Sequence, residues 1–206
     1  QKSFSDIQIS PKLLSGPLSK TRATLNCDSL VREGFSALAP PVSLERALVI
    51  ASGSGMGISR ETVGRLALCP SVRKIFVAGI EGASNGKIIF LGKSKEMLSI
   101  MAETDFVVTN GGFSALSEAV VGRRPLIVIP IPGHYEQTHN ARTVELAGLG
   151  VVSCNENLSD GVEKLIRLFK DHQDRFRTVR APAEGANIAA QVLVNLGVRS
   201  ELVRGN

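Results

Sequence analysis

Hydrophobic and polar positions change their pattern near residue 46. Beyond it, short apolar runs alternate with segments of helical periodicity. The apolar runs predict strands at 47–51, 74–78, 87–91, 106–108, 126–129 and 151–153. Helices are predicted at 58–68, 94–102, 114–121, 137–147, 158–170 and 185–196. This alternation is typical of an α/β fold, so we expect a Rossmann-like parallel sheet of about six strands with helices on both faces.

The first part of the chain has a different texture. Residues 19–46 are rich in Ser, Ala, Pro and Leu and show weak periodicity, while 7–9 predict a short strand and 15–18 (SGPL) a turn. We interpret residues 1–45 as a linker or the remnant of an N-terminal domain. Residues 46–206 are predicted to form the domain proper.

Composition narrows the function classes. The net charge of +5 arises from 24 basic and 19 acidic residues without long like-charge runs, which indicates a solvated surface or attraction to phosphates or a lipid surface. Basic blocks are missing and aromatic residues make up 4%, which argues against nucleic-acid binding. Cys27, Cys69 and Cys154 form no CxxC pair, so we expect reduced cysteines in a cytoplasmic protein, with no metal or disulfide framework.

The sequence contains no apolar run of about 18 residues, the length that a membrane-spanning helix requires. Its start also lacks the apolar core of a signal peptide. The first residue is Gln1 and not an initiator Met, which favours a processed or excised piece of a longer protein.

A glycine-rich turn, Gly53-Ser54-Gly55-Met56-Gly57, follows the first strand of the predicted domain. Such a turn lets the backbone approach a phosphate closely, although a plain tight turn has the same composition. Ile58 stands where a dinucleotide-binding fingerprint requires its last glycine, and no GK[ST] phosphate loop is present. The turn is therefore either structural or part of a ligand-lining loop.

A second motif joins Asn110-Gly111-Gly112-Phe113-Ser114 to Glu118. Backbone amides at 112–114 can hold an anion, aided by the positive end of the helix dipole. Ser114 could bind that anion or cap the helix. Glu118 lies one turn further on the same helical face, where its carboxylate would suit two adjacent ribose hydroxyls; the alternative is an ordinary surface Glu.

The third motif is Glu136-Gln137 followed by Asn140-Ala141, where an acid and an amide at a helix start could bind sugar hydroxyls. The alternative is simply a capped helix that follows the turn Pro132-Gly133. His134 could line the same cleft. We expect His139 to face away and His172 to be solvated. No two of these histidines lie at a metal-ligand spacing, so no metal site is predicted.

Taken together, the motifs over 105–142 resemble the C-terminal, nucleotide-sugar-binding half of GT-B glycosyltransferases. The likeness is closest to the MurG-type N-acetylglucosaminyltransferases (glycosyltransferase family 28) and their archaeal relatives, and it covers roughly 46–195. The resemblance implies a UDP-sugar, with UDP-GlcNAc first, as donor for inverting hexosyl transfer to an acceptor hydroxyl on a lipid-linked glycan. The UDP-sugar is then a substrate, and no cofactor is expected.

The resemblance also assigns residues to parts of the donor. It implies that the diphosphate is bound by Gly111, Gly112, Phe113 and Ser114, the ribose by Glu118, and the sugar by Glu136 and Gln137, with His134 nearby. Gly53, Ser54 and Gly55 would face the donor, and the backbone at Lys93 and Ser94 would read the uracil edge. Many members carry His or Arg where Asn110 stands, so Asn110 contributes a hydrogen bond without charge, and Arg60 or Lys93 could compensate.

Partners and alternatives follow from the same likeness. The acceptor site and catalytic base are expected on an N-terminal domain in cis or on a partner subunit in trans, so the catalytic residue is unknown here. We expect a cytoplasmic location, with peripheral association at the inner face of a membrane left open. The alternatives are a UDP-GlcNAc 2-epimerase-like enzyme, a non-catalytic nucleotide-sugar-binding subunit of a two-protein transferase and, more remotely, a nicotinamide dehydrogenase.

Overall fold

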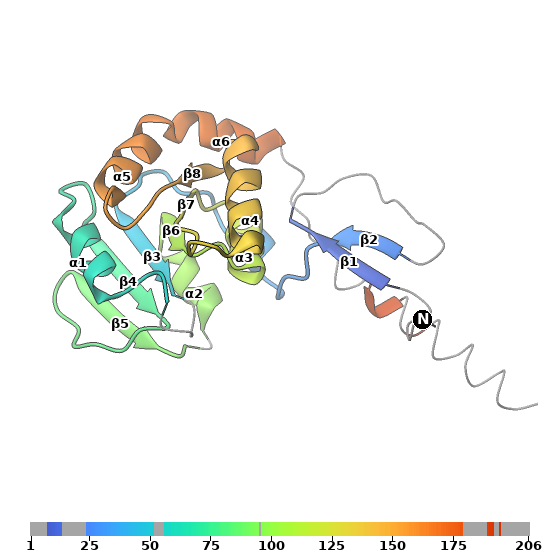
Figure 1. The fold of residues 1–206 in the computed structure, drawn as a ribbon, viewed down its shortest axis with the longest axis horizontal. Coiled ribbons are helices and arrows are strands. Elements are labelled where there is room, and N and C mark those ends of the chain that lie inside the picture. Colours follow the sequence, from blue (N-terminus) through green and yellow to red (C-terminus); the bar gives the residue numbers. More distant parts are fainter. Residues whose placement is uncertain are drawn as a thin grey trace, which may run out of the picture.

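The domain is built on one parallel sheet. The structure, a computed structural model, describes residues 8–13, 24–51, 56–94, 96–178, 189–191 and 194. The sheet contains six strands, which are β3 (Arg46–Ile50), β4 (Lys74–Ala78), β5 (Ile88–Gly92), β6 (Phe106–Thr109), β7 (Leu126–Val128) and β8 (Gly150–Val152). Their order is β5-β4-β3-β6-β7-β8, and every pairing is parallel (Figure 1).

The direction of winding reverses between β3 and β6. From β3 the chain moves outward to β4 and β5, then returns to place β6 on the other side of β3. In open α/β sheets, ligands bind beyond the carboxyl ends of the strands at this point. At the far edge, the β4–β5 pairing shifts register between Val77 and Ala78.

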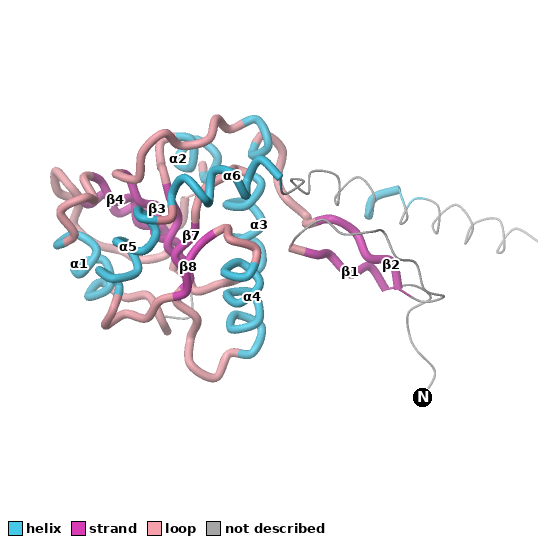
Figure 2. Tube along the Cα trace, turned by 90° about the horizontal axis from the view of Figure 1, so that it is seen from above, coloured by secondary structure: helices cyan, strands magenta, loops and turns pink. Residues whose placement is uncertain are grey.

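Helices cover both faces of the sheet, as predicted. One face packs on α2 (Met97–Ala102), α3 (Phe113–Val121), α4 (Tyr135–Leu146) and α6 (Phe169–Thr178), and the other packs on α1 (Arg60–Leu68) and α5 (Leu158–Arg167). Alternate residues of β3 divide between the two cores, with Leu48 in the first and Ala47 and Val49 in the second. Figure 2 shows α3 and α4 on the opposite side of the strands from α1 and α5.

Most predicted elements are present with small shifts of their ends. The single helix predicted at 158–170 is wrong, because α5 ends at Arg167 and α6 begins at Phe169. Val162 and Leu165 of α5 pack on one face of the sheet, whereas Phe176 of α6 packs on the other. The chain must therefore bend to pass from one face to the other. The helix predicted at 185–196 lies mostly outside the described residues.

The N-terminal part contains more structure than the sequence predicted. The strand expected at 7–9 corresponds to β1 (Gln8–Lys12), which pairs in parallel with an unpredicted β2 (Thr24–Asp28). The unpredicted 3₁₀ helix η1 (Phe35–Ala37) places Phe35 in the core against α3. The division of the chain into residues 1–45 and 46–206 stays a prediction. Within the first part, residues 29–45 pack on the domain. The turn predicted at 15–18 lies outside the described residues.

The described helices are short. None is long and apolar enough to cross a lipid bilayer within the ranges that the structure describes.

Candidate functional site

A cleft of about 610 Å³ opens at the carboxyl ends of β3, β4 and β5. Its walls come from those strand ends, from α2 and α3, and from the segment before β3. The lining residues are Leu30, Arg32, Ile50, Ala51, Ala78, Gly79, Gly92, Lys93, Ser94, Met97, Ser114, Ala115 and Glu118. The volume falls within the range of small-molecule sites, and the position beside the reversal of winding is where such a sheet binds ligands.

Gly79 keeps the floor of this cleft narrow. Its backbone has φ +85°, and a β-carbon there would lie 2.5 Å from the carbonyl oxygen of Ala51. Only glycine therefore lets the end of β4 lie this close to the end of β3. The loop that follows Ala51, with the predicted donor residues Gly53, Ser54 and Gly55, lies outside the described residues.

Helix α3 begins at the wall of the cleft. Gly112 is its N-cap and Ser114 already lies inside the helix, so the alternative that Ser114 caps the helix is wrong. Ser114 is the second residue of α3 and lines the cleft. The positive end of the helix dipole and an exposed hydroxyl thus lie at the same wall, an arrangement that favours an anion.

Glu118 lies one turn deeper on α3 and is held by an arginine from the segment before β3. Arg32 donates from Nε to Oε1 at 2.7 Å and from Nη2 to Oε2 at 3.0 Å. The Glu118 side chain is 12% exposed and that of Arg32 is 53% exposed. The hydrogen bond to Glu118 raises the pKa of Arg32 above its ordinary value, so the guanidinium stays charged.

Two asparagine side chains brace the neighbouring loops. Asn110, which is buried, donates from Nδ2 to the carbonyl of Ile129 at 2.9 Å. Asn140 donates from Nδ2 to the carbonyl of Gly111 at 3.0 Å, and so ties the turn before α3 to helix α4. Among the residues that the structure describes at the cleft, Asn110 does not appear, and its predicted contact with a diphosphate stays a prediction.

The start of α4 carries the predicted sugar-binding pair. Gln137 is buried, and its Oε1 accepts a hydrogen bond from the Ile131 amide at 3.0 Å. Glu136 and His134 are exposed. His134 is the N-cap of α4 and accepts from the Gln137 amide through Nδ1 at 3.4 Å, so the capping alternative holds for this helix. Sugar contacts by these residues stay predictions.

The other histidines differ in their surroundings. His139 is exposed, as expected. The prediction that His172 is solvated is wrong, because its side chain is buried and its Nδ1 lies 2.7 Å from the Gly148 carbonyl oxygen. The charged residues around it in α6 conceal that this position faces the core.

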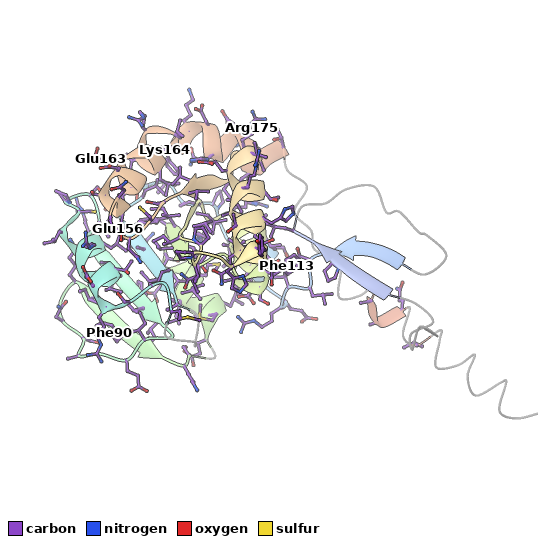
Figure 3. All side chains as sticks on the ribbon, in the orientation of Figure 1. Phe90, Phe113, Glu156, Glu163, Lys164 and Arg175 are labelled. Carbon is purple, nitrogen blue, oxygen red and sulfur yellow. The ribbon has the colours of Figure 1, made fainter. Side chains whose placement is uncertain are left out.

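The structure thus gathers part of the predicted site. Lys93, Ser94, Ser114 and Glu118 line one cleft. Gly111, Gly112 and Phe113 form the turn and first residue that lead into α3, and Figure 3 labels Phe113 at this start. Among the described residues, His134, Glu136 and Gln137 are not part of the cleft lining. Arg60 also lies apart and donates to the carbonyl of Glu81.

Arg32 was not predicted from the sequence as a residue of the cleft. It lies 86 positions from Glu118 in a segment without clear periodicity, so no spacing pattern connects the two residues. Its only local signal is a cation just before the buried Phe35.

A second cavity lies elsewhere and has a different character. It measures about 580 Å³ between α1 and α5 and is lined largely by apolar atoms of residues such as Leu68, Cys69, Pro70 and Leu158. Figure 3 labels Glu156 and Glu163 of this region on the side of the domain away from Phe113. Burial raises the pKa of the Cys69 thiol there. No group of three or more His, Cys, Asp or Glu side chains suited to a metal occurs in the described ranges.

Comparison with known proteins agrees with this arrangement. Residues 78–193, more than half of the chain, match the glycosyltransferase family 28 C-terminal domain. The uncharacterized glycosyltransferase MK0977 of Methanopyrus kandleri is 34% identical over 155 residues, which cover 71% of this chain and 45% of that protein. A further relative, from Geobacillus kaustophilus, is 29% identical over 105 residues, covering 49% of this chain and 29% of that protein. It is named a UDP-N-acetylglucosamine--N-acetylmuramyl-(pentapeptide) pyrophosphoryl-undecaprenol N-acetylglucosamine transferase.

Among solved structures, the glycotransferase of kitacinnamycin aligns with a TM-score of 0.64 at 17% identity. The alignment covers 92% of this chain and 54% of that one, so it supports the fold. The chain spans less than half the length of the curated relatives that it matches. With the family model matching more than half of its residues, the chain belongs to the glycosyltransferase family 28 C-terminal domain family.

Proposed function

We propose that this chain is the donor-binding half of a glycosyltransferase, and that it binds a UDP-sugar for inverting hexosyl transfer to an acceptor hydroxyl. One observation carries the proposal. The cleft at the reversal of winding places a nearly buried carboxylate, Glu118, one helical turn from the open N-terminus of α3 and from Ser114. A carboxylate suits ribose hydroxyls, and the helix start suits a diphosphate.

The proposed reaction uses residues of this chain and a general base from a second domain or subunit. A general base deprotonates the acceptor hydroxyl, whose oxygen attacks the anomeric carbon and displaces UDP. The amides at the start of α3 and the nearby cations Lys93 and Arg32 would stabilise the charge that develops on the leaving diphosphate. We assign the base to an N-terminal domain in cis or to a partner subunit in trans, which agrees with the greater length of the relatives.

UDP-GlcNAc is the first donor to test. Support comes from the name of the Geobacillus kaustophilus relative, which transfers N-acetylglucosamine to an undecaprenol-linked acceptor. The same name supports a lipid-linked acceptor, and hence a cytoplasmic protein working at the inner face of a membrane. The sugar itself would lie toward Glu136 and Gln137 at the start of α4.

The test is a calorimetric titration with UDP, UDP-GlcNAc and UDP-glucose. Wild-type protein should bind UDP, and Glu118→Gln should weaken UDP about tenfold, because a hydrogen bond to a charged group is worth roughly 1.5 kcal/mol or more. Glu163→Gln removes a similar carboxylate from the exposed face of α5 and should leave binding unchanged. Glu136→Ala should weaken UDP-GlcNAc relative to UDP.

Several results would overturn the assignment. Absence of uridine nucleotide binding by the wild-type chain contradicts donor binding, and unchanged UDP affinity in Glu118→Gln contradicts the ribose role. Epimerised sugar formed from UDP-GlcNAc without any acceptor would favour an epimerase instead. Binding without transfer, followed by transfer once an N-terminal domain is supplied, is the outcome that we expect.

A further inference from the structure

Exposed apolar side chains occur at two opposite edges of the sheet. Leu30, Met56 and Tyr135 lie at the carboxyl edge, beside the proposed donor site. Leu68 and Ile166, which are 82% and 39% exposed, lie at the amino edge, where α1 and α5 end. Exposed apolar residues that gather on one face of a soluble domain are a common sign of an interaction site. The proposed function accounts for the first edge and gives the second no role.

The outer face of α1 and α5 is also hollowed. In Figures 1 and 2 these two helices lie next to each other on the outside of the domain. The cavity of about 580 Å³ between them includes Leu68 and Ile166 in its lining. A neighbouring cavity of about 360 Å³ shares Pro70, Ser71 and Ile166 with it, so the two hollows adjoin. This face therefore carries both a protruding leucine and apolar hollows, a shape that suits contact with a copy of itself.

The position of this face makes it unsuited to the domain or subunit that would bring the acceptor. The proposed transfer requires that partner to face the carboxyl edge of the sheet, where Ser114 and Glu118 line the cleft. The smaller hollow lies beside the starts of β3 and β4, at the amino edge. A partner that covers the cleft therefore leaves the α1–α5 face open, and a different molecule must occupy it.

Helix α5 presents an acid and a base on this face. Glu163 and Arg167 are exposed, lie one helical turn apart and both line the larger cavity. Within the described ranges neither takes part in an ion pair, whereas Arg65 across the cavity is paired with Glu61 at 2.8 Å. A two-fold axis makes each contact occur twice with the roles exchanged. If two copies of α5 pack antiparallel around such an axis, Glu163 of each copy lies opposite Arg167 of the other, which gives two ion pairs.

We propose that the outer face of α1 and α5 is the interface of a homodimer, in which the α5 helices of two copies pack antiparallel and pair Glu163 with Arg167. Leu68 and Ile166 become buried between the copies and supply the apolar part of the contact. The donor cleft of each copy lies outside the interface and stays open to the acceptor-binding domain or subunit. The inference does not depend on the donor chemistry.

The size of the face limits the strength of the dimer. Helices of 9 and 10 residues are about 15 Å long and about 10 Å wide, so the two together present a flat area of roughly 300 Å². A stable interface buries about 800 Å² on each partner. We therefore expect a weak dimer with a dissociation constant on the order of 100 μM, which forms as the protein concentration rises.

The first experiment measures the mass of the full chain by analytical ultracentrifugation over a range of concentrations. Wild-type protein should shift from the mass of one chain toward that of two. Leu68→Gln should weaken self-association about tenfold, because each dimer loses two apolar contacts. Leu146→Gln is the matched control. Its side chain is 78% exposed at the end of α4, on the other side of the sheet, so self-association should be unchanged.

The second experiment exchanges charges between copies. Glu163→Arg and Arg167→Glu each place like charges opposite one another, so each variant alone should self-associate about tenfold more weakly or less. An equimolar mixture of the two restores opposite charges at both contacts and should form a heterodimer within about threefold of the wild-type affinity. Arg142→Glu reverses an exposed charge on α4, and its mixture with Glu163→Arg should show no such recovery. Circular dichroism checks that each variant keeps its helices.

Each result decides for or against the proposed dimer. Wild-type protein that stays a single chain at about ten times the expected dissociation constant overturns it and leaves the face to a helix of another protein. Equal weakening by Leu68→Gln and Leu146→Gln places the interface elsewhere and also overturns it. Charge variants that weaken association without recovery in the mixture contradict the antiparallel packing of α5. Recovery in the mixture, with none in its control, is the result that we expect.

Discussion

Two arginine–carboxylate pairs join segments that are far apart in the sequence. They differ in how many hydrogen-bond acceptor positions of the carboxylate remain unused. Arg46, the first residue of β3, binds Asp105, the residue before β6, at 2.7 Å, and the Asp105 side chain is fully buried. Asp105 also accepts from the backbone amides of Glu45 and Arg46, at 3.0 and 2.8 Å. Both amides bind Oδ2, and the Arg46 guanidinium adds two donors to Oδ1, from Nε at 3.2 Å and from Nη2 at 2.7 Å. The acceptor positions of both oxygens are therefore used by the protein.

Glu118 is the opposite case. It also meets a bidentate arginine at 2.7 Å, yet no backbone amide bonds to it in the described ranges, and it borders an open cleft. The comparison shows that an ion pair as such does not indicate function. What separates a structural carboxylate from a candidate ligand-binding one is the number of acceptor positions that folding leaves unused.

The largest effect that separates the two pairs should come from Asp105→Ala. It leaves two backbone amides and a guanidinium without their buried acceptor, which should cost about 3 kcal/mol of unfolding free energy. Urea denaturation measures this cost. Asp174→Ala removes a surface ion pair and should change stability by only about 0.5 kcal/mol. A loss from Asp105→Ala no larger than this control would contradict the structural role.

A second effect concerns Arg124, which has no carboxylate hydrogen-bonded to it in the described ranges. It is buried and donates to the carbonyls of Met101, Ala39 and Gly122, while burial lowers its pKa to about 10. Arg124→Ala removes these three hydrogen bonds and should cost about 2 kcal/mol. The segment 29–45 should also show faster amide hydrogen exchange than in the control Arg142→Ala, whose side chain is exposed. Unchanged exchange in this segment would contradict the anchoring role of Arg124.

The smallest effect on folding should come from Glu118→Gln. The amide oxygen can still accept from Arg32, and Arg32 is half exposed, so the unfolding free energy should fall by about 1 kcal/mol or less. The same variant is the one expected to lose nucleotide affinity. A loss of stability as large as that of Asp105→Ala would place Glu118 among the structural carboxylates and remove the contrast.

The fold was more predictable than the site, and the residues show why. The bounds of β4 were predicted correctly because the apolar run Ile75–Ala78 is bounded by Lys74 and Gly79, which are local signals. The break between α5 and α6 was missed, because periodicity shows that a helix has an apolar side but not which face of the sheet receives it. His172 was misjudged for the same reason.

The candidate site was predictable where one short segment builds it. Ser114 and Glu118 lie on one helical face, and four positions of separation suffice to place both at one wall of the cleft. Arg32 required the tertiary structure, since its contact with Glu118 spans 86 positions. The predicted roles of Asn110, Gly111 and Glu136 in donor binding stay predictions.

The ends of the sheet bear on a different property, the tendency of an open strand to recruit another chain. At one edge, β8 contains three residues and offers few backbone groups for a foreign strand to pair with. At the other edge, the register shift between Val77 and Ala78 disturbs the regular ladder next to β5. An interrupted ladder and a very short strand both discourage pairing with a strand of another molecule. We therefore expect this sheet not to gain strands from other chains at high protein concentration.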